Sequence, residues 1–158
     1  MPTNINTKRD IFNFLKWFKR DEKNYKGQFA WGDLQQVNGL LLRLLDEWRD
    51  TLGKACTIHA AYETVGHGTY SEHNRGDAID CHFSNCTLWD AYQALQKVLA
   101  KYNLQTRVGI GIYTWWANPG FHLDLRGFEL TWISDKSGVY VYDKAKAIAR
   151  MKQIAGVK

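Results

Sequence analysis

The chain contains little cysteine and little proline. Its three cysteines, Cys56, Cys81 and Cys86, are odd in number and form no CxxC pair, so the sequence predicts reduced, partly buried thiols rather than a disulfide framework or a thiolate metal site. Only two prolines are present, and no repeat or low-complexity segment marks a linker. We therefore expect a single domain over residues 1–158.

Long apolar runs are also absent. No stretch approaches the roughly 20 apolar residues that cross a bilayer, which predicts no membrane span. The opening residues, MPTNINTKRDIFNFLKWF, lack the apolar block and cleavage site of a secretory signal. We expect synthesis in the cytoplasm without a signal peptide. Hydrophobic residues nevertheless make up 45% of the chain, which is enough to build a core.

Positive charge is concentrated at the two ends. The net charge is +5, yet residues 8–26 hold seven basic against three acidic residues, and residues 136–158 hold six against one. The remainder is therefore acidic. Basic ends favour any polyanion, such as nucleic acid or an anionic cell-wall polymer, but they also suit ordinary solvated helix faces. An acidic centre favours a cation site and argues against a nucleic-acid groove, so we predict no nucleic-acid partner.

Hydrophobic periodicity predicts an α+β fold. Apolar residues recur at helical spacing in four segments, which predicts helices over residues 8–20, 33–51, 87–98 and 143–155. Gly53 is placed to end the second helix, and Thr87 with Asp90 forms a capping-box pattern at the start of the third. Short β-like runs lie between the helices, at residues 55–60, 78–83, 107–113, 121–126, 130–134 and 139–142. Hairpin connections, one of them at residues 135–138, indicate a largely antiparallel central sheet flanked by helices.

A period of two sorts the side chains of the predicted strands. In FHLDLR, residues 121–126, the side chains of His122, Asp124 and Arg126 share one face. In AIDCHF, residues 78–83, Asp80 and His82 share the polar face. The strand RVGIGIY has two glycines on one face, where a ligand or another backbone can approach closely.

His73, Asp80 and His122 form a candidate metal site. A catalytic zinc ion takes three such protein ligands and leaves a fourth position open. Asp80 and His122 lie on polar strand faces, and Gly76 allows the loop that carries His73 to fold back towards them. The spacing alone also fits a loop histidine and a solvent-facing acid.

Two segments resemble the signatures of one enzyme family. SEHNRGDAID resembles the SxHxxGxAxD signature of the zinc D-alanyl-D-alanine carboxypeptidase and murein endopeptidase family, whose fold is shared with the Hedgehog signalling domain. VGIGIYTWWANPGFHLDLRG resembles the second signature of that family, a glycine-rich strand with a tyrosine followed by HxD and an arginine. The resemblance covers residues 31–134. It implies a Hedgehog/DD-peptidase-like fold with Zn²⁺ bound by His73, Asp80 and His122.

The resemblance also implies a function. Members hydrolyse peptide bonds in the stem peptides or cross-links of peptidoglycan, as carboxypeptidases or endopeptidases, with a water activated by zinc. A small chain without an export signal suggests a phage or prophage member, a monomer that reaches the bacterial cell wall after phage-mediated release or as a virion component. The alternative is a non-catalytic, zinc-stabilised domain that binds the cell wall or a protein.

The proton-transferring carboxylate is harder to assign. Many members have an acid three residues before the last histidine ligand, where this chain has Pro119. The first candidate is Asp124, as the base or as the residue that orients it, with a supporting bond to a ligand histidine as the other interpretation. Glu63 is the second candidate, although many relatives have a substrate-binding arginine there, so the carboxypeptidase mode is in question. By its offset from His73, His67 matches a histidine near the metal in Hedgehog-type relatives and is a candidate for stabilising an oxyanion.

Further residues are expected around the metal, in contact with substrate or behind the ligands: Ser71, Arg75, Tyr113 and Arg126. Trp115 and Trp116, just before the last ligand, can line a substrate cleft or bury a loop. Glu72 is expected to point away from the metal.

Overall fold

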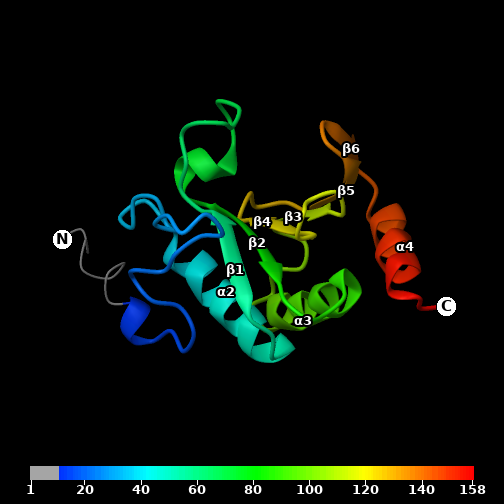
Figure 1. Ribbon diagram of the computed structural model, residues 1–158, viewed down its shortest axis with the longest axis horizontal. Coiled ribbons are helices and arrows are strands. Elements are labelled where there is room, and N and C mark those ends of the chain that lie inside the picture. Colours follow the sequence, from blue (N-terminus) through cyan, green and yellow to red (C-terminus); the bar gives the residue numbers. More distant parts are fainter. Residues whose placement is uncertain (1–10) are drawn as a thin grey trace.

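The computed structural model describes residues 11–158 and shows one α+β domain built on a mixed six-stranded sheet (Figure 1). The strands are β1 (Cys56–Ala60), β2 (Ala78–Phe83), β3 (Gly109–Tyr113), β4 (Gly120–Asp124), β5 (Leu130–Lys136) and β6 (Val139–Val141). Their order across the sheet is β1-β2-β4-β3-β5-β6, and only the β3–β5 pair is parallel. The predicted α+β class with a largely antiparallel sheet is confirmed.

The core lies between the apolar face of the sheet and two helices, α2 (Gly39–Leu52) and α3 (Leu88–Lys101), which pack against each other below the sheet in Figure 1. Trp48 of α2 anchors this contact. Its ring centroid is 4.7 Å from that of Phe83 and 5.2 Å from that of Phe121, and its indole N–H donates to the carbonyl of Ala91 at 2.7 Å. The helices therefore cover one face only, and the polar face is left for the candidate site.

The predicted helix ends are found where their capping residues lie. Gly53 ends α2 with a left-handed backbone (φ 68°), and Thr87 and Asp90 form a capping box at the start of α3. Helix α4 (Lys144–Ala155) begins after Asp143, whose carboxylate accepts from the backbone N–H of Lys146, and it packs against β5 and α3. No helix within residues 11–158 has the length and apolar character that a membrane crossing needs.

The helix predicted over residues 8–20 is wrong for the part that the structure describes. Residues 8–10 lie outside that part, and the rest contains only the 3₁₀ helix η1 (Ile11–Asn13). The backbone N–H groups of Lys16 and Trp17 donate to the carboxylate of Asp46 on α2, at 3.0 and 2.8 Å. The Asp46 carboxylate therefore accepts the hydrogen bonds that backbone carbonyls would accept if this segment were helical.

The helix predicted from residue 33 begins six residues later, at Gly39. Asn38 has an extended backbone, and its side-chain oxygen accepts from the N–H of Leu40 at 2.9 Å, which fixes the start of α2. Of the apolar residues predicted on this helix before Asn38, Val37 is buried in the core and Leu34 is partly buried against it. Periodicity therefore identified the buried positions but not the first residue of the helix.

Candidate metal centre

The three predicted metal ligands converge on the polar face of the sheet. His73, Asp80 and His122 offer ligand atoms that all lie within 4.8 Å of one another. His73 Nε2 is 3.2 Å from Asp80 Oδ2 and 3.3 Å from His122 Nδ1, and His122 Nδ1 is 2.9 Å from Asp80 Oδ1. Two imidazole nitrogens and a carboxylate form a donor set that can hold a divalent metal ion.

Strand register brings two of these side chains together. Asp80 on β2 is the direct cross-strand partner of His122 on β4. Directly paired residues of an antiparallel sheet point to the same face with their Cβ atoms about 5 Å apart. The contact between the carboxylate and the imidazole follows from this pairing alone.

A single short turn carries His73 to the same point. The 3₁₀ helix η2 (Glu72–Arg75) is capped by Ser71, whose hydroxyl accepts from the N–H of His73 at 3.3 Å. Gly76 then reverses the chain with φ +75°, and a Cβ on it would lie 1.7 Å from the carbonyl oxygen of Gln36. The fold-back expected at Gly76 is therefore present, and only glycine fits there.

Each histidine is held by its far ring nitrogen. His73 Nδ1 donates to the carbonyl of Ala61 at 2.7 Å, and His122 Nε2 lies 2.8 Å from Asp124 Oδ2. His73 Nε2 and His122 Nδ1 are the nitrogens left to face Asp80. Metal-binding histidines are oriented in this way, by a carbonyl or a carboxylate behind the ring.

Asp124 is the centre of the polar network behind the ligands. Its side chain is fully buried, and Oδ1 accepts from the backbone N–H of Gly109 and of Arg126, both at 3.1 Å, and from Arg126 Nε at 2.8 Å. Oδ2 faces His122 and Arg126 Nη2. With both oxygens engaged, Asp124 is placed to orient His122. This geometry favours the orienting role over that of the base.

The charges of the cluster support one another. Burial disfavours the ionised form of Asp80, but the charges of His73 and His122 and their hydrogen bonds outweigh it and hold the Asp80 pKa well below its usual range. The Asp124 pKa is lowered in the same way, against burial, by Arg126 and His122. Burial also opposes a charge on His122, yet hydrogen bonds to Asp124 and Asp80 raise its pKa to about 9. A metal ion would displace that proton, so binding should weaken in acid.

The bare glycine face of β3 is filled by the chain itself. A Cβ on Gly109 would lie 2.4 Å from Arg126 Nε and 2.5 Å from an Asp124 carboxylate oxygen. A Cβ on Gly111 would lie 2.6 Å from the indole of Trp132. The sequence predicted close approach at these glycines, and the approaching groups are side chains of the site.

Replacing Gly109 with alanine should destabilise the fold by about 1–3 kcal/mol, the usual cost of overpacking, because the new methyl group displaces Asp124 and Arg126. Urea denaturation measures this directly. Gly39→Ala is the matched control, since a Cβ there meets open space at the first turn of α2. Equal midpoints for Gly109→Ala and the wild type would contradict the described packing.

The metal-binding residues line a cavity of about 440 Å³ whose other walls are largely aromatic. Tyr113, Trp115 and Trp116 are there, as the sequence predicted. Trp132, on the neighbouring strand, was missed, although it is the register partner of Gly111 and occupies the space that this glycine leaves. Two other missed aromatic residues, Tyr140 and Tyr142, had a sequence signal in the alternation of VYVY.

Glu63 and His67 lie together beside the ligands. His67 Nε2 is 3.0 Å from Glu63 Oε2, and the His67 ring stacks on that of His73 with centroids 4.2 Å apart and planes at 17°. Both residues line a second hollow, of about 480 Å³, which shares His67, Asp80, Trp115 and Trp116 with the first. The side chain of Glu63 is 44% exposed, so its carboxylate is accessible from the cleft.

The remaining predicted positions differ in their placement. Arg75 is largely exposed and lies 3.7 Å from Glu72, so the structure shows its ion pair and no place for it in the cavity wall. Glu72 is among the residues that line the cavity, and its carboxylate forms the ion pair with Arg75. Pro119 lines a different cavity.

Two further histidines pair on the same sheet face. His59 Nε2 and His82 Nδ1 are 2.6 Å apart, and the His59 ring packs between those of Tyr25 and Trp116, each 4.9 Å away. Burial, and then the neighbouring His82, lower the pKa of His59 to about 4. The pKa of His82 is also lowered by burial. Burial therefore favours the neutral form of both imidazoles.

Acidification should weaken the fold through His59. Its ordinary pKa is 6.5 and its folded value is about 4, so the unfolded chain binds the proton more readily. The stability that it contributes is present above pH 6.5 and is lost as the pH falls towards 4. Unfolding midpoints for the wild type and for His59→Gln, measured between pH 7 and pH 4, test this, because the variant should lose less stability. Parallel curves would argue against the prediction.

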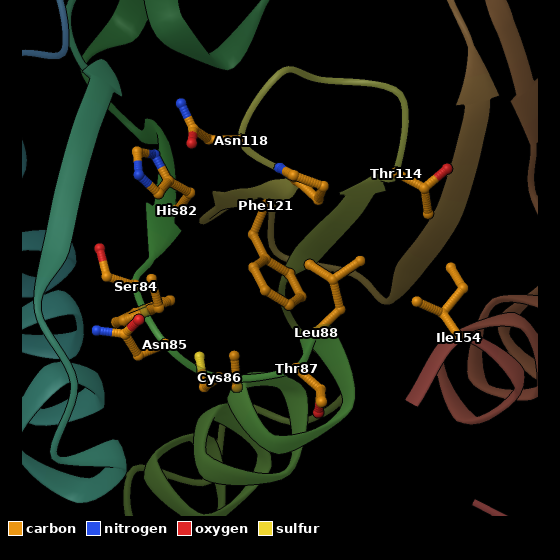
Figure 2. A pocket seen from close by; sticks show the side chains of 13 residues that line it. His82, Ser84, Asn85, Cys86, Thr87, Leu88, Thr114, Asn118, Phe121 and Ile154 are labelled. Carbon is orange, nitrogen blue, oxygen red and sulfur yellow. The ribbon is translucent and has the colours of Figure 1, made fainter. Parts of the chain in front are cut away.

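Another hollow, lined in part by His82, contains none of the three candidate metal ligands (Figure 2). It measures about 550 Å³, with Phe121 and Leu88 at its floor and Ile154 of α4 on the opposite side. His82 and Asn118 stand at one edge. Asn118 also lines the 480 Å³ hollow, so the two hollows adjoin each other there. The 550 Å³ hollow is lined by no predicted catalytic or metal-binding residue.

Comparisons of the chain with protein-family models, with curated proteins and with solved structures find no match.

Proposed function

We propose that the protein is a zinc-dependent peptidase that hydrolyses peptide bonds in peptidoglycan stem peptides or cross-links. The observation that carries the proposal is the convergence of His73, Asp80 and His122, with both imidazoles oriented from behind. The two sequence signatures support a Hedgehog/DD-peptidase-like fold around this cluster. The open aromatic cavity beside it supports a substrate of some size.

The donor set fits zinc. Two neutral imidazole nitrogens and one carboxylate, within 4.8 Å of one another, match the three-ligand sets of catalytic zinc sites, which keep one position open. Zinc held there would polarise a scissile carbonyl and make water a nucleophile near neutral pH. No cysteine is among the ligands, in accord with a catalytic rather than a structural site.

Glu63 is the proposed proton-transferring residue, and His67 is the proposed oxyanion-stabilising residue. The Glu63 carboxylate is exposed to the cleft, it bonds His67, and His67 stacks on the ligand His73. A carboxylate with free access can take a proton from water and return it to the leaving amine. The His67 imidazole lines the metal cavity, and its proposed role is to stabilise a developing oxyanion. Asp124 and Arg126 are positioning residues behind His122.

The protein would act on the bacterial cell wall as a phage or prophage endolysin or as a virion component. The basic residues near both ends of the chain would favour retention on anionic wall polymers. A monomer is expected because each proposed ligand and each proton-transferring residue comes from the same chain.

A non-catalytic, zinc-stabilised wall-binding domain is the second candidate. The observation that favours it is the commitment of Asp124 to Arg126 and His122, together with proline at the position where relatives have an acid. Under this function Glu63 has no role in proton transfer. Zinc content does not separate the two candidates, but product formation does.

The test incubates the zinc-loaded protein with purified peptidoglycan of several wall types and measures newly released amines and muropeptide fragments. Glu63→Gln should lower the rate about 10²–10⁴-fold, the usual contribution of a general base, without loss of bound zinc. Asp50→Asn, at an exposed acid on α2 that lines neither of the two hollows, is the control. Absence of products from the zinc-loaded wild type on every wall type would favour the binding domain.

A further inference from the structure

An aromatic wall extends from the metal cluster to the edge of the sheet. It consists of Tyr113, Trp132, Tyr140 and Tyr142, and all four line the metal cavity. Trp132 lies at its inner end, 5.2 Å from the ring of the ligand His122. From there the ring contacts continue outward, from Trp132 to Tyr142 at 6.0 Å and from Tyr142 to Tyr140 at 6.3 Å.

The outer part of the wall, formed by two tyrosines of the last hairpin, is exposed on the cavity side. Tyr140 and Tyr142 are 47% and 63% exposed, although large aromatic side chains are usually buried. Alternation along the hairpin directs both tyrosines to the cavity side, where they meet Tyr113 and Trp132, while Val139 and Val141 point the other way. The exposed rings thus continue the surface of the cavity.

The chemistry of the wall is uncharged. The charged residues described in this cavity lie at its metal end: Asp80 and Asp124 in the cluster, Glu72 beside it, and Arg126, which is bonded to Asp124. The Arg126 guanidinium also lies over the buried inner ring, with its Cζ 5.2 Å from the Trp132 centroid, so the exposed rings of the wall are those of Tyr140 and Tyr142. The wall itself offers flat apolar rings with hydroxyl groups at their rims. Such a surface suits a neutral ligand with flat C–H faces and many hydroxyls, which is the chemistry of a sugar ring.

We propose that the aromatic wall binds the glycan strand of peptidoglycan and holds the stem peptide at the metal. The inference rests on the proposed function and adds to it, because it identifies the glycan-attached stem peptide, rather than a free peptide, as the substrate. Continuity of the wall with the ligand His122 places the sugar and the scissile bond in one cavity. The tyrosines are binding residues with no part in the proton transfers.

Binding to the full chain after removal of metal by chelation tests the proposal without turnover. The probes are a disaccharide–tetrapeptide, the same tetrapeptide without sugars, and the disaccharide alone, with affinities from calorimetry. In the wild type the sugars should tighten binding about tenfold or more, equivalent to about 1.4 kcal/mol. Tyr140→Ala/Tyr142→Ala should lose this advantage and bind the free tetrapeptide as before. Tyr140→Phe/Tyr142→Phe should retain most of it, and Val141→Thr, on the other side of β6, is the matched control.

Three results would overturn the inference. The first is that the sugars add nothing to the affinity of the wild type. The second is that the alanine variant loses as much affinity for the free tetrapeptide as for the disaccharide–tetrapeptide. The third is that sedimentation shows a dimer for the wild type and a monomer for the alanine variant. The last result would make a second copy, paired along β6, the occupant of the wall. Product release is measured separately, on peptidoglycan: zinc-loaded wild type that releases products from peptidoglycan but shows no sugar advantage in binding fails only this inference. Sugar-dependent binding without products fails only the proposed hydrolysis.

Discussion

Replacing His73 with alanine is expected to abolish zinc binding and peptidoglycan hydrolysis together. His73 is 2% exposed, and its Nε2 faces both Asp80 and His122, so the alanine variant loses one of the three ligand atoms of the cluster. Losing a residue that merely supports a ligand costs about 10–100-fold in metal affinity, and losing the ligand itself should cost more. Zinc content after dialysis and amine release from peptidoglycan are the two measurements.

The same variant should remove the stabilisation that zinc gives to the fold. At a free zinc concentration of 100 times Kd, binding to the native state alone contributes about 2.7 kcal/mol. Zinc should therefore raise the Tm of the wild type, chelation should lower it, and neither should move the Tm of His73→Ala. His82→Gln, a histidine change on the same sheet face, is the control and should still bind zinc. One tightly bound zinc per chain in His73→Ala would refute the assigned ligands.

Replacing Asp124 with alanine should have the largest effect on stability, about 3–5 kcal/mol, because it leaves charged groups unpaired in the interior. Arg126, whose side chain is 18% exposed, would lose its carboxylate partner, and the N–H of Gly109 would lose its acceptor. His122 would lose the bond that orients its ring. Denaturant unfolding measures the loss, and zinc affinity should fall about 10–100-fold in the more conservative Asp124→Asn.

Two comparisons isolate the cause. Asp50→Ala removes an exposed carboxylate that pairs with Lys16 and accepts from the Trp17 indole, and it should cost much less stability than Asp124→Ala. Asp124→Ala/Arg126→Ala removes both members of the buried pair and should be less destabilised than the sum of the single changes. Additive losses in the double variant would mean that the pair does not act as a unit. Unchanged zinc affinity in Asp124→Asn would remove its positioning role.

The chemistry of the candidate site could be read from the sequence because it depends on residue types in short segments. The histidine and aspartate of SEHNRGDAID are separated by a glycine that the turn requires, and a period of two places His122 and Asp124 on one strand face. Capping residues such as Thr87 act within four residues of their partners, so the start of α3 was also predictable. These are local interactions, and the sequence contains them in full.

Other features depended on contacts between distant residues. The cross-strand pairing of Asp80 with His122 joins residues that are 42 positions apart. The stacking of His67 on His73 and the placement of Glu72 in the cavity depend on how the loop before β2 folds. Asp46 on α2 accepts hydrogen bonds from the backbone N–H groups of residues 16 and 17, where periodicity had predicted a helix. The donors that surround the Asp124 carboxylate also come from the fold and favour an orienting role for it.

The sequence by itself determined the α+β class, the buried positions and the three residues that can hold a metal, because spacing and side-chain type decide those. Only the tertiary structure decided which nitrogen each imidazole presents, that the carboxylate of Asp124 is fully engaged by its neighbours, and that tyrosines of the last hairpin line the metal cavity. The physical reason is that hydrogen bonds and ring contacts require atoms within a few ångströms, and chain folding alone sets those distances.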